Sequence, residues 1–343
     1  MTSGRALGVG VVGLGFMGRT HLAAYKAAND AGHANRLVAV CDSDPERRKG
    51  IAAAAGNMQT GASAERMFDP SHVRAYAKAD ELFADREVEL VSICTQTPTH
   101  VELALAALAA GKHVLLEKPV ALTSADAERL ARAAAESKGL CMPAMCIRFW
   151  PAWAWVKHAI DAGRYGAVRS AVFRRLGTAP QWAPGFYGDP KQSGGALFDL
   201  HVHDADFVRF CFGDAQSVTS TGSLEHVTTL YRFAKGPAHV VAEGGWDHTP
   251  GFAFKMAYTV VFEHATLDYE FGRAHELVLA HEGKSMPVAL EPLNGYDGEV
   301  RHLLDAIASG SRKLDATMAD ALAHTRMLEA ERRSIESGAL VAL

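Results

Sequence analysis

The sequence predicts an α/β domain with a parallel sheet, residues 1–147, followed by an α+β domain with an antiparallel sheet, residues 148–343. Two observations support this fold class. Before residue 148, short apolar runs alternate with alanine-rich helical stretches, which is typical of parallel strands joined by right-handed crossovers. After Trp150, a succession of strand-like runs lies between helical segments, with Gly and Pro residues at the turns.

A glycine-rich turn joins the first predicted strand to the first helix. The apolar run Val9–Val12 ends in G-x-G-x-x-G, whose glycines are Gly13, Gly15 and Gly18, and a helical pattern follows from His21. The first glycine permits a tight turn, the second lets the backbone approach a pyrophosphate, and the third allows close packing of helix on strand. The helix N-terminus offers a positive dipole end to phosphates. The segment predicts a dinucleotide-binding turn; the alternative is an ordinary glycine-rich turn.

Asp42 follows the second predicted strand, Leu37–Cys41, and lies 24 residues after the last glycine of the turn. A carboxylate at this place accepts hydrogen bonds from a ribose diol and repels a 2′-phosphate. Ser43 adds no positive charge, whereas Arg47 and Arg48 on the following helix are the groups that would favour a 2′-phosphate. Together these residues predict NAD as the cofactor rather than NADP.

The first domain continues with strands and helices in alternation. We expect strands at Leu90–Cys94 and His113–Leu116, and helices at His100–Leu108 and Ala125–Ser137, the last capped by Ser124. The segment 57–85 is less regular and has strand character only at Val73–Tyr76.

The second domain is predicted to mix helices with an antiparallel sheet. Its expected elements are a helix at Ala152–Ala162, a strand at Ala167–Leu176, a helix at Gly195–Phe212, several strands within Val218–Leu290, and helices around Glu299–Ala308 and Met318–Ile335. Turn residues such as Glu282-Gly283-Lys284 separate the strands. We expect a ligand to bind between the two domains.

Composition limits the function classes. The chain is 48% hydrophobic and 22% charged, with a formal net charge of −4 and no long basic run, so we expect no nucleic-acid partner. No apolar stretch reaches the roughly 18 residues that a membrane span needs, and the first residues lack the pattern of a signal peptide. The five cysteines form no disulfide-like framework and suit a reducing compartment. We expect a cytoplasmic protein with no membrane contact.

The tripeptide Glu117-Lys118-Pro119 follows the fifth strand-like run directly. Ligands of parallel α/β sheets bind beyond the carboxyl ends of the strands, so a lysine here reaches the expected cleft. Its ammonium can hydrogen-bond a substrate hydroxyl and help an alkoxide to form. Pro119 is a candidate for a cis peptide bond. Taken alone, such a tripeptide is more often a solvated loop.

Asp199 and His203 are four positions apart in a predicted helix, so both side chains are expected on one face. A carboxylate beside an imidazole holds its tautomer and favours its action as a general base. Such a base can take the proton of an alcohol as hydride leaves the carbon. The alternative is a pair that only stabilises the helix surface.

Histidines two positions apart, His201 and His203, precede Asp204 and Asp206 and raise the alternative of a metal hydrolase. Residues two apart on a helix point in different directions, and a metal site would need further ligands from elsewhere. We therefore expect no metal site in this motif, and we expect His201 to face away from the active site.

Aromatic side chains gather in two places near the expected cleft. Phe149, Trp150, Trp153 and Trp155 follow the last strand of the first domain, and most of this group is expected to pack in the core. Trp182 and Tyr187 lie in a segment rich in Pro and Gly and are the better candidates to stack on a sugar.

In these motifs the chain resembles the Gfo/Idh/MocA oxidoreductases, which include glucose–fructose oxidoreductase and inositol dehydrogenase. The resemblance covers nearly the whole chain and rests on an ordered set of motifs: GVGVVGLGFMGRTH, CD after the second strand, AGKHVLLEKP, RFWP, GGALFDLHVHDADFV and YDGEVRHLLDAI. It implies a Rossmann domain followed by a domain with a large, mostly antiparallel open sheet. That sheet commonly forms the oligomer interface, so the resemblance implies a homodimer or homotetramer.

The resemblance also implies site residues. His203 would be the general base, Asp199 its modulator, and Lys118 the group that orients the alcohol and meets the nicotinamide ribose. Near the substrate it places Lys118, Asp199 and His203 with Arg148, Trp150, Trp182 and Tyr187. Near the cofactor it places Gly13, Gly15, Phe16, Met17, Gly18, Asp42, Ser43, Arg47, Thr95, Thr97, His100, Glu117 and Lys118.

The chain departs from the family pattern at three places. Relatives often have Pro directly after the Thr that ends the fourth strand, whereas here the order is Thr95-Gln96-Thr97-Pro98. His201 occupies a position that often holds a small residue. The segment 57–71 is longer than usual, and we have no functional account of it.

These observations predict an NAD-dependent dehydrogenase acting on a secondary hydroxyl of a sugar, polyol or inositol-like substrate. One alternative is a redox-neutral enzyme of the epimerase or glycosidase type, which oxidises and then reduces its sugar with retained NAD. A second alternative is a sensor that binds dinucleotide or sugar without chemistry. The presence of Lys118, Asp199 and His203 argues against the sensor.

Overall fold

The computed structural model describes residues 5–51 and 66–343, so the segment 57–71 lies largely outside the described residues. The chain folds into two compact units. The first comprises residues up to Cys146 together with Tyr296–Leu322, and the second comprises Ile147–Gly295 and Ala323–Leu343. The sequence predicted a single division of the chain, after residue 147. In the structure, residues 296–322 also belong to the first unit. The reason is apolar packing, since Met318 and Ala321 belong to the core of the first unit.

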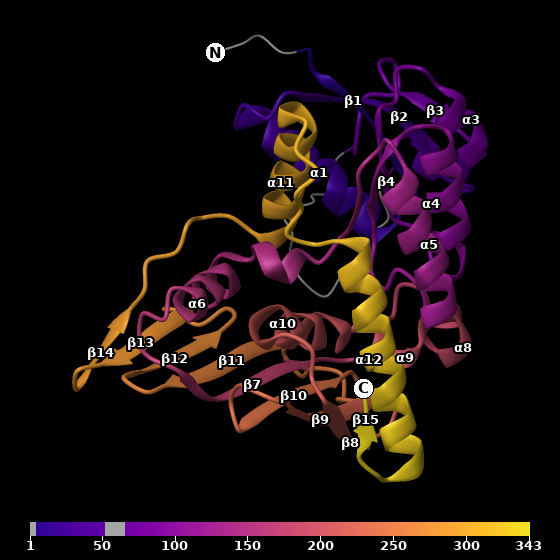
Figure 1. Ribbon diagram of the computed structural model, residues 1–343. Helices are drawn as coiled ribbons and strands as arrows, with labels where there is room; N and C mark the ends of the chain where they lie inside the picture. The colour runs from indigo at the N-terminus through magenta and orange to yellow at the C-terminus, as the bar shows by residue number, and fades with distance from the viewer. Residues whose placement is uncertain (1–4, 52–65) are drawn as a thin grey trace. The chain divides into compact units, whose positions relative to one another are not determined.

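The first unit contains a parallel six-stranded sheet in the order β3-β2-β1-β4-β5-β6 (Figure 1), which is the Rossmann arrangement. Its strands are β1 (Leu7–Val12), β2 (Asn35–Cys41), β3 (Arg74–Tyr76), β4 (Leu90–Ile93), β5 (His113–Leu116) and β6 (Cys141–Pro143). The fold class predicted for this part of the chain is confirmed. Buried apolar side chains on these strands explain why the runs form a sheet covered on both faces.

The helices of the first unit are α1 (Phe16–Asp30), α2 (Pro45–Arg48), α3 (Ala79–Ala84), the 3₁₀ turn η1 (Thr97–Thr99), α4 (His100–Ala109), α5 (Ser124–Glu136) and α11 (Gly295–Ser309). The N-cap predicted for α5 is wrong by one residue. Thr123, not Ser124, is the cap, and its hydroxyl accepts the Asp126 N–H at 3.2 Å. The alternation of helix and strand is otherwise as predicted.

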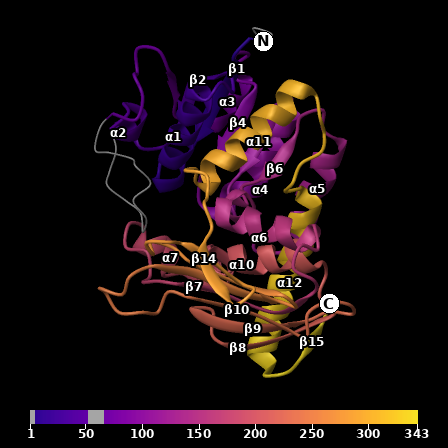
Figure 2. The ribbon, with the colours of Figure 1, turned by 90° about the vertical axis from the view of Figure 1, so that its left-hand side faces the viewer.

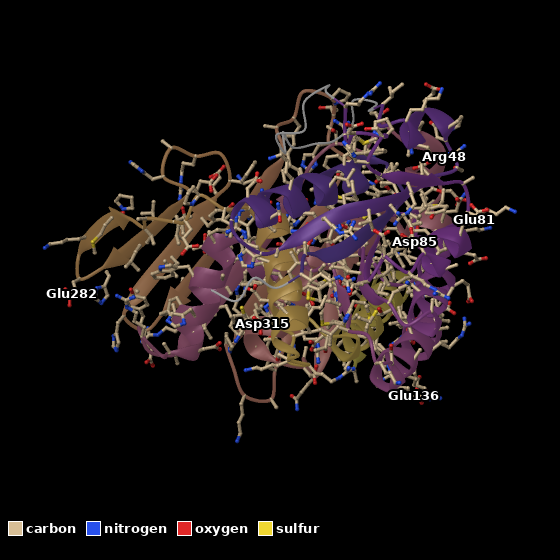
Figure 3. All side chains as sticks on the ribbon, turned by 90° about the horizontal axis from the view of Figure 1, so that it is seen from above. Arg48, Glu81, Asp85, Glu136, Glu282 and Asp315 are labelled. Atoms are coloured by element: carbon tan, nitrogen blue, oxygen red, sulfur yellow. The ribbon has the colours of Figure 1, made fainter. Side chains whose placement is uncertain are left out.

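The second unit contains a nine-stranded sheet in the order β14-β13-β12-β11-β7-β10-β9-β8-β15. Its strands are β7 (Val168–Leu176), β8 (Ser217–Gly222), β9 (His226–Arg232), β10 (His239–Gly245), β11 (Lys255–Phe262), β12 (Ala265–Glu270), β13 (Leu277–His281), β14 (Lys284–Pro287) and β15 (Val341–Ala342). All neighbours pair antiparallel except β7 with β10, so the sheet is mostly antiparallel, as predicted. Glu282 marks the tight turn between β13 and β14 (Figure 3), where it and Gly283 both have positive φ.

The helices of the second unit are α6 (Pro151–Asp161), α7 (Pro184–Tyr187), α8 (Pro190–Ser193), α9 (Gly195–Asp199), α10 (Val202–Phe212) and the greater part of α12 (Met318–Ser337), with the 3₁₀ turn η2 (Cys146–Phe149) at the start. In both ribbon views α6 and α10 lie on the same side of the sheet (Figure 1 and Figure 2). Trp153 of α6 packs there against Phe173 and Phe207, whereas side chains on the other face remain half-exposed.

A single helix over Gly195–Phe212 was expected, and this prediction is wrong. The segment forms two helices, α9 and α10, with a break at Leu200–His201. At the break the backbone N–H groups of Leu200 and His201 both donate to the Ala196 carbonyl. Leu200 and His201 keep right-handed helical backbone angles, so the break is a widened turn between Asp199 and His203. Among the described residues, no helix combines the length and the apolar character that crossing a membrane requires.

Candidate active site

The glycine-rich turn has the geometry that a pyrophosphate needs. Gly13 has φ of 85°, and a Cβ on it would lie 2.7 Å from the Cys94 carbonyl oxygen. A Cβ on Gly18 would lie 1.9 Å from the Gly13 oxygen, so only glycine lets α1 approach β1 this closely. Gly15 is the N-cap of α1, and no side chain caps the helix there. A Cβ on Gly15 would approach only an Arg47 nitrogen, at 3.9 Å. With no acidic residue in the first helical turn, the turn fits the phosphates of a dinucleotide.

Asp42 lies at the end of β2 beside this turn. One carboxylate oxygen accepts the Leu14 N–H at 2.6 Å and the other accepts the Asp44 N–H at 2.9 Å. The carboxylate is buried, and Arg47 approaches it to 3.7 Å. Asp42 thus supports the glycine-rich turn, a structural role that sequence reasoning missed, and its contact with a ribose diol remains a prediction. Of its neighbours, Ser43 is exposed.

Lys118 lies in the loop after β5, and the Lys118–Pro119 peptide bond is cis, as Pro119 suggested. His100 connects this loop to the loop after the neighbouring strand β4. Its two ring nitrogens lie 2.8 Å from the Pro119 oxygen and 3.0 Å from the Thr95 oxygen. His100 is fully buried, and this burial lowers its pKa. His100, which was predicted to bind the cofactor, therefore holds the Lys118 loop in place.

A buried hydrogen-bond network supports the backbone at Lys118. The backbone N–H of Lys118 donates to the Glu117 carboxylate at 3.1 Å. Glu117 in turn lies 2.8 Å from His21 Nε2, and His21 Nδ1 lies 3.1 Å from the Ser92 hydroxyl. Tyr25 completes the network at 2.8 Å from Ser92. Glu117 is buried and belongs to this network, so the EKP tripeptide is not a solvated loop.

Glu299 on α11 also faces this network, and sequence reasoning missed its role. Its side chain is fully buried, lies 3.9 Å from His21 Nε2, and neither carboxylate oxygen has a hydrogen-bond partner among the described residues. Burial, and then the neighbouring charge of Glu117, raise the pKa of Glu299 well above its ordinary value. Both causes favour the protonated, neutral form of this carboxyl. The only available sequence sign was an acid at an apolar helical position within YDGEV.

Glu299→Gln is expected to remove a loss of stability that the wild type shows as pH rises. In the wild type the folded state holds the Glu299 proton to higher pH than the unfolded state, which releases it above the ordinary pKa of glutamate, about 4.3. Wild-type stability is therefore lost as pH rises through the window above that value, by at most about 1.4 kcal/mol per pH unit. Urea unfolding from pH 5 to 8 measures this. Glu136→Gln, at the exposed end of α5 (Figure 3), is the control. Parallel curves for wild type and Glu299→Gln would contradict the protonated state.

In the second unit, Asp199 and His203 occupy the ends of two different helices. Asp199 is the last residue of α9, and His203 is the second residue of α10. The argument from four-residue spacing on one continuous helix is therefore wrong, although both side chains are half-buried. Their roles as modulator and base remain predictions.

His201 is buried at the helix break rather than exposed on a helix surface. Its Nε2 lies 2.9 Å from a Glu331 oxygen and 3.2 Å from the Tyr231 hydroxyl. The neighbouring carboxylates are also engaged: Asp204 pairs with Arg175 at 2.7 Å, and Asp206 pairs with Arg148 at 2.6 Å. The H-x-H-D-x-D motif is therefore largely built into the core of the second unit.

Three of the four residues predicted only for substrate binding lie in aromatic surroundings. Trp150 caps α6 and meets Phe271 edge-on at 6.1 Å. Trp182 and Tyr187 contact each other edge-on at 5.6 Å, and Tyr187 meets Trp246 at 5.8 Å. Trp150 and Trp246 are buried, whereas Trp182 and Tyr187 are half-buried, so of these rings the last two offer a face for stacking on a sugar.

Arg148, the fourth, is buried. Two of its nitrogens bind the two Asp206 oxygens at 2.8 and 2.6 Å, and the guanidinium lies over the Phe210 ring at 4.5 Å. This geometry gives Arg148 a structural role in the second unit. Its predicted contact with substrate remains a prediction.

Comparison with known proteins adds to this geometry. The NAD-binding Rossmann domain of the oxidoreductase family Gfo/Idh/MocA matches residues 7–145, and the C-terminal domain of the same family matches residues 153–268. The chain belongs to this family. The resemblance stated from its motifs is confirmed, and with it the NAD-binding Rossmann fold of the first domain.

The chain is similar to several named dehydrogenases. Inositol 2-dehydrogenase of Rhizobium meliloti is 32% identical over 63% of this chain and 58% of the relative. Myo-inositol 2-dehydrogenase of Thermotoga maritima is 27% identical over 68% of this chain and 67% of the relative. The alignment thus spans less than two thirds of the first relative's length. A levoglucosan dehydrogenase solved with NADH and levoglucosan has a TM-score of 0.84 at 21% identity, covering 98% of this chain and 99% of its own, which supports the fold.

Proposed function

We propose that the protein is an NAD-dependent dehydrogenase that oxidises a secondary alcohol of a sugar, polyol or inositol-like substrate. The observation that carries the proposal is the buried network that holds Lys118 beside a dinucleotide-binding turn. A solvated lysine would need no such support. The dehydrogenase relatives named for inositol and levoglucosan agree with this substrate class.

The proposed roles are divided between the two units. Lys118 of the first unit donates a hydrogen bond to the substrate oxygen and stabilises negative charge that develops there. His203 of the second unit accepts the hydroxyl proton, and Asp199 favours the imidazolium that results. Nicotinamide, when bound, supplies the hydride acceptor. The turn Gly13–Gly18 and Asp42 would hold the cofactor's phosphates and ribose.

A screen of inositols, polyols and aldoses with NAD, followed by NADH absorbance, tests the proposal. Net NADH formation that depends on one substrate class supports it. Turnover without NADH release, with NAD retained through purification, would instead identify the redox-neutral type. Binding of NAD and sugar without turnover of any substrate would favour the sensor.

NAD is expected to give the higher kcat/KM of the two nicotinamide cofactors. Asp42 repels a 2′-phosphate and accepts a diol. Arg48 uses its guanidinium on the Asp42 and Ser43 carbonyls, at 2.7 and 2.9 Å. Asp42→Ala is not a clean test because the carboxylate also holds Leu14. Steady-state kinetics of the wild type with both cofactors decide the question, and a higher kcat/KM with NADP would reject the preference.

We also propose a cytoplasmic homodimer or homotetramer that assembles through the half-exposed face of the nine-stranded sheet. Alternate residues of β11 and β12 lie half-exposed on that face, and one open face of an antiparallel sheet is available either to water or to a second copy of the chain. All five cysteines are free thiols, in keeping with a reducing compartment. Sedimentation velocity of the purified protein gives the oligomeric state.

A further inference from the structure

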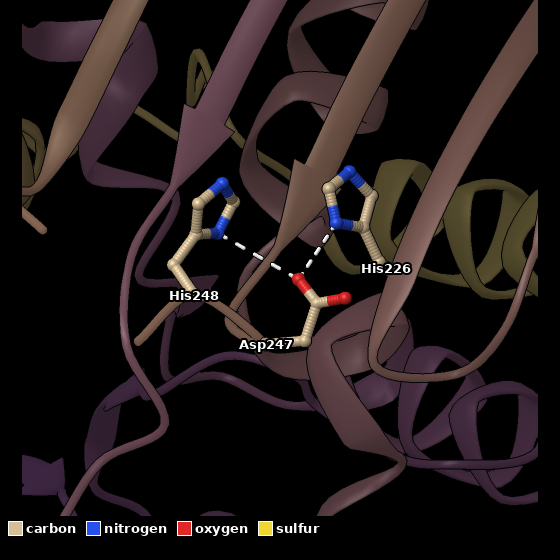
Figure 4. A group of neighbouring side chains, drawn as sticks. All are labelled: His226, Asp247 and His248. Atoms are coloured by element: carbon tan, nitrogen blue, oxygen red, sulfur yellow. Dashed lines mark hydrogen bonds and ion pairs between the residues drawn. The ribbon is translucent and has the colours of Figure 1, made fainter. Parts of the chain in front are cut away.

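Two histidines and an aspartate of the second unit gather at one end of the nine-stranded sheet (Figure 4). His226 begins β9 and pairs with Gly245, the last residue of β10. Asp247 and His248 follow β10 after one residue, Trp246, and a backbone bridge joins Asp247 to Thr178. The three side chains therefore come from the start of β9 and the segment just after β10, which pair with each other at this end of the sheet.

Both imidazoles present the same nitrogen to the same carboxylate oxygen (Figure 4). His226 Nδ1 lies 2.7 Å from Asp247 Oδ1, and His248 Nδ1 lies 3.6 Å from it. One ligand atom from each residue lies within 4.8 Å of the other two. The His248 Nδ1 atom is buried and has no hydrogen-bond partner among the described residues. A hydrogen-bonded pair of Asp247 and His226 would explain the shorter contact, but it leaves His248 Nδ1 without a hydrogen bond at 3.6 Å from the same oxygen.

Neighbouring side chains support each imidazole from outside. The second nitrogen of His226, Nε2, lies 3.4 Å from a Glu243 oxygen, and Glu243 pairs with Arg174 at 3.1 Å. The His248 ring stacks on Phe252 with centroids 4.1 Å apart. A ligating histidine characteristically donates its other N–H to a carboxylate, which fixes tautomer and ring orientation. His226 has this arrangement.

Glycine at position 245 makes room for the cluster. A Cβ on Gly245 would lie 2.6 Å from the Cγ atom of His226, so any other residue would displace the imidazole. The absence of a side chain at Gly245 thus leaves room for the His226 ring, which lies over this position of β10.

We propose that His226, Asp247 and His248 form a binding site for a divalent transition-metal ion of the zinc type. Two imidazole nitrogens and a carboxylate oxygen are the donor set that such an ion prefers, and three protein ligands leave one position for water or an exogenous ligand. Binding requires Asp247 Oδ1 and His226 Nδ1 to separate slightly. The site is distinct from Lys118, Asp199 and His203.

The other group with comparable spacing, His21, Glu117 and Glu299, differs in its surroundings. Both ring nitrogens of His21 already have hydrogen-bond partners, and Glu117 holds the Lys118 backbone. That group belongs to the network described above. The side chains of His226, Asp247 and His248 are partly exposed, whereas those of His21, Glu117 and Glu299 are buried. Of these two groups, only the first is directly accessible to an ion from solution.

The experiment measures zinc binding to full-length, untagged protein that has been dialysed against EDTA and then freed of chelator. Titration with ZnCl₂ by calorimetry, and metal analysis after gel filtration, are expected to show one saturable site per chain. His226→Ala and His248→Ala are each expected to weaken that site by about tenfold or more, because each removes a ligand. Asp247→Asn is expected to weaken it as well.

His239→Ala is the matched control, since it removes an exposed imidazole from β10 outside the cluster. It is expected to leave zinc affinity unchanged. Circular dichroism melts show whether each variant folds, and His248→Gln replaces His248→Ala if the alanine variant does not. Absence of saturable binding overturns the proposal. So does binding that persists unchanged in folded His226 and His248 variants.

Discussion

His203→Ala is expected to lower kcat for alcohol oxidation by on the order of a hundredfold or more, the usual contribution of a positioned general base. The alanine variant cannot accept the hydroxyl proton near the start of α10. The rise of the oxidation rate with pH that an imidazole base produces near neutrality should disappear with it. Stopped-flow and steady-state measurements of NADH formation across the neutral range test both effects.

The controls for His203→Ala follow from the structure. His158→Ala removes an exposed imidazole from α6 in the same unit and is expected to keep wild-type turnover. His201→Ala is unsuitable as a control, although His201 was expected to face away from the active site, because it leaves Glu331 buried beside an empty position. Asp199→Asn is expected to fold and to shift the pH dependence. Near wild-type turnover in folded His203→Ala would remove this residue from the mechanism.

Lys118→Ala is expected to lower kcat by on the order of a hundredfold while weakening NAD binding far less. The ammonium is proposed to act on the reacting oxygen, where one lost donor typically has an effect of about that size. The loop itself is held by other groups, namely Glu117 and His100, so the backbone should stay in place. Fluorescence titration with NADH and steady-state kinetics separate binding from turnover.

Lys118→Arg separates charge from geometry at this position. It keeps the positive charge but replaces a compact ammonium with a planar fork, so partial recovery of turnover is expected. Lys138→Ala removes an exposed lysine of the first unit and should change neither constant. If Lys118→Ala lowered NAD affinity and left kcat intact, the lysine would be a cofactor ligand only.

Local sequence patterns determined much of the first unit. The glycine-rich turn, the terminal Asp42 and the alternation of runs are local features, because strand and helix periodicity and turn chemistry act over a few residues. The resemblance of the ordered motifs to a known family extended the fold prediction to both domains. The mostly antiparallel sheet of the second unit followed from turn residues between strand-like runs.

Only the tertiary structure decided which polar groups meet. Glu299 faces His21 across more than 270 residues of sequence, and Glu331 reaches His201 across 130. The same holds for the break between α9 and α10 and for the group formed by His226, Asp247 and His248. Spacing along the chain cannot reveal such pairs, since their partners come from packed elements whose contact depends on the whole fold. A buried polar group must find its partner in space, and the sequence by itself determines only which groups are available to be paired.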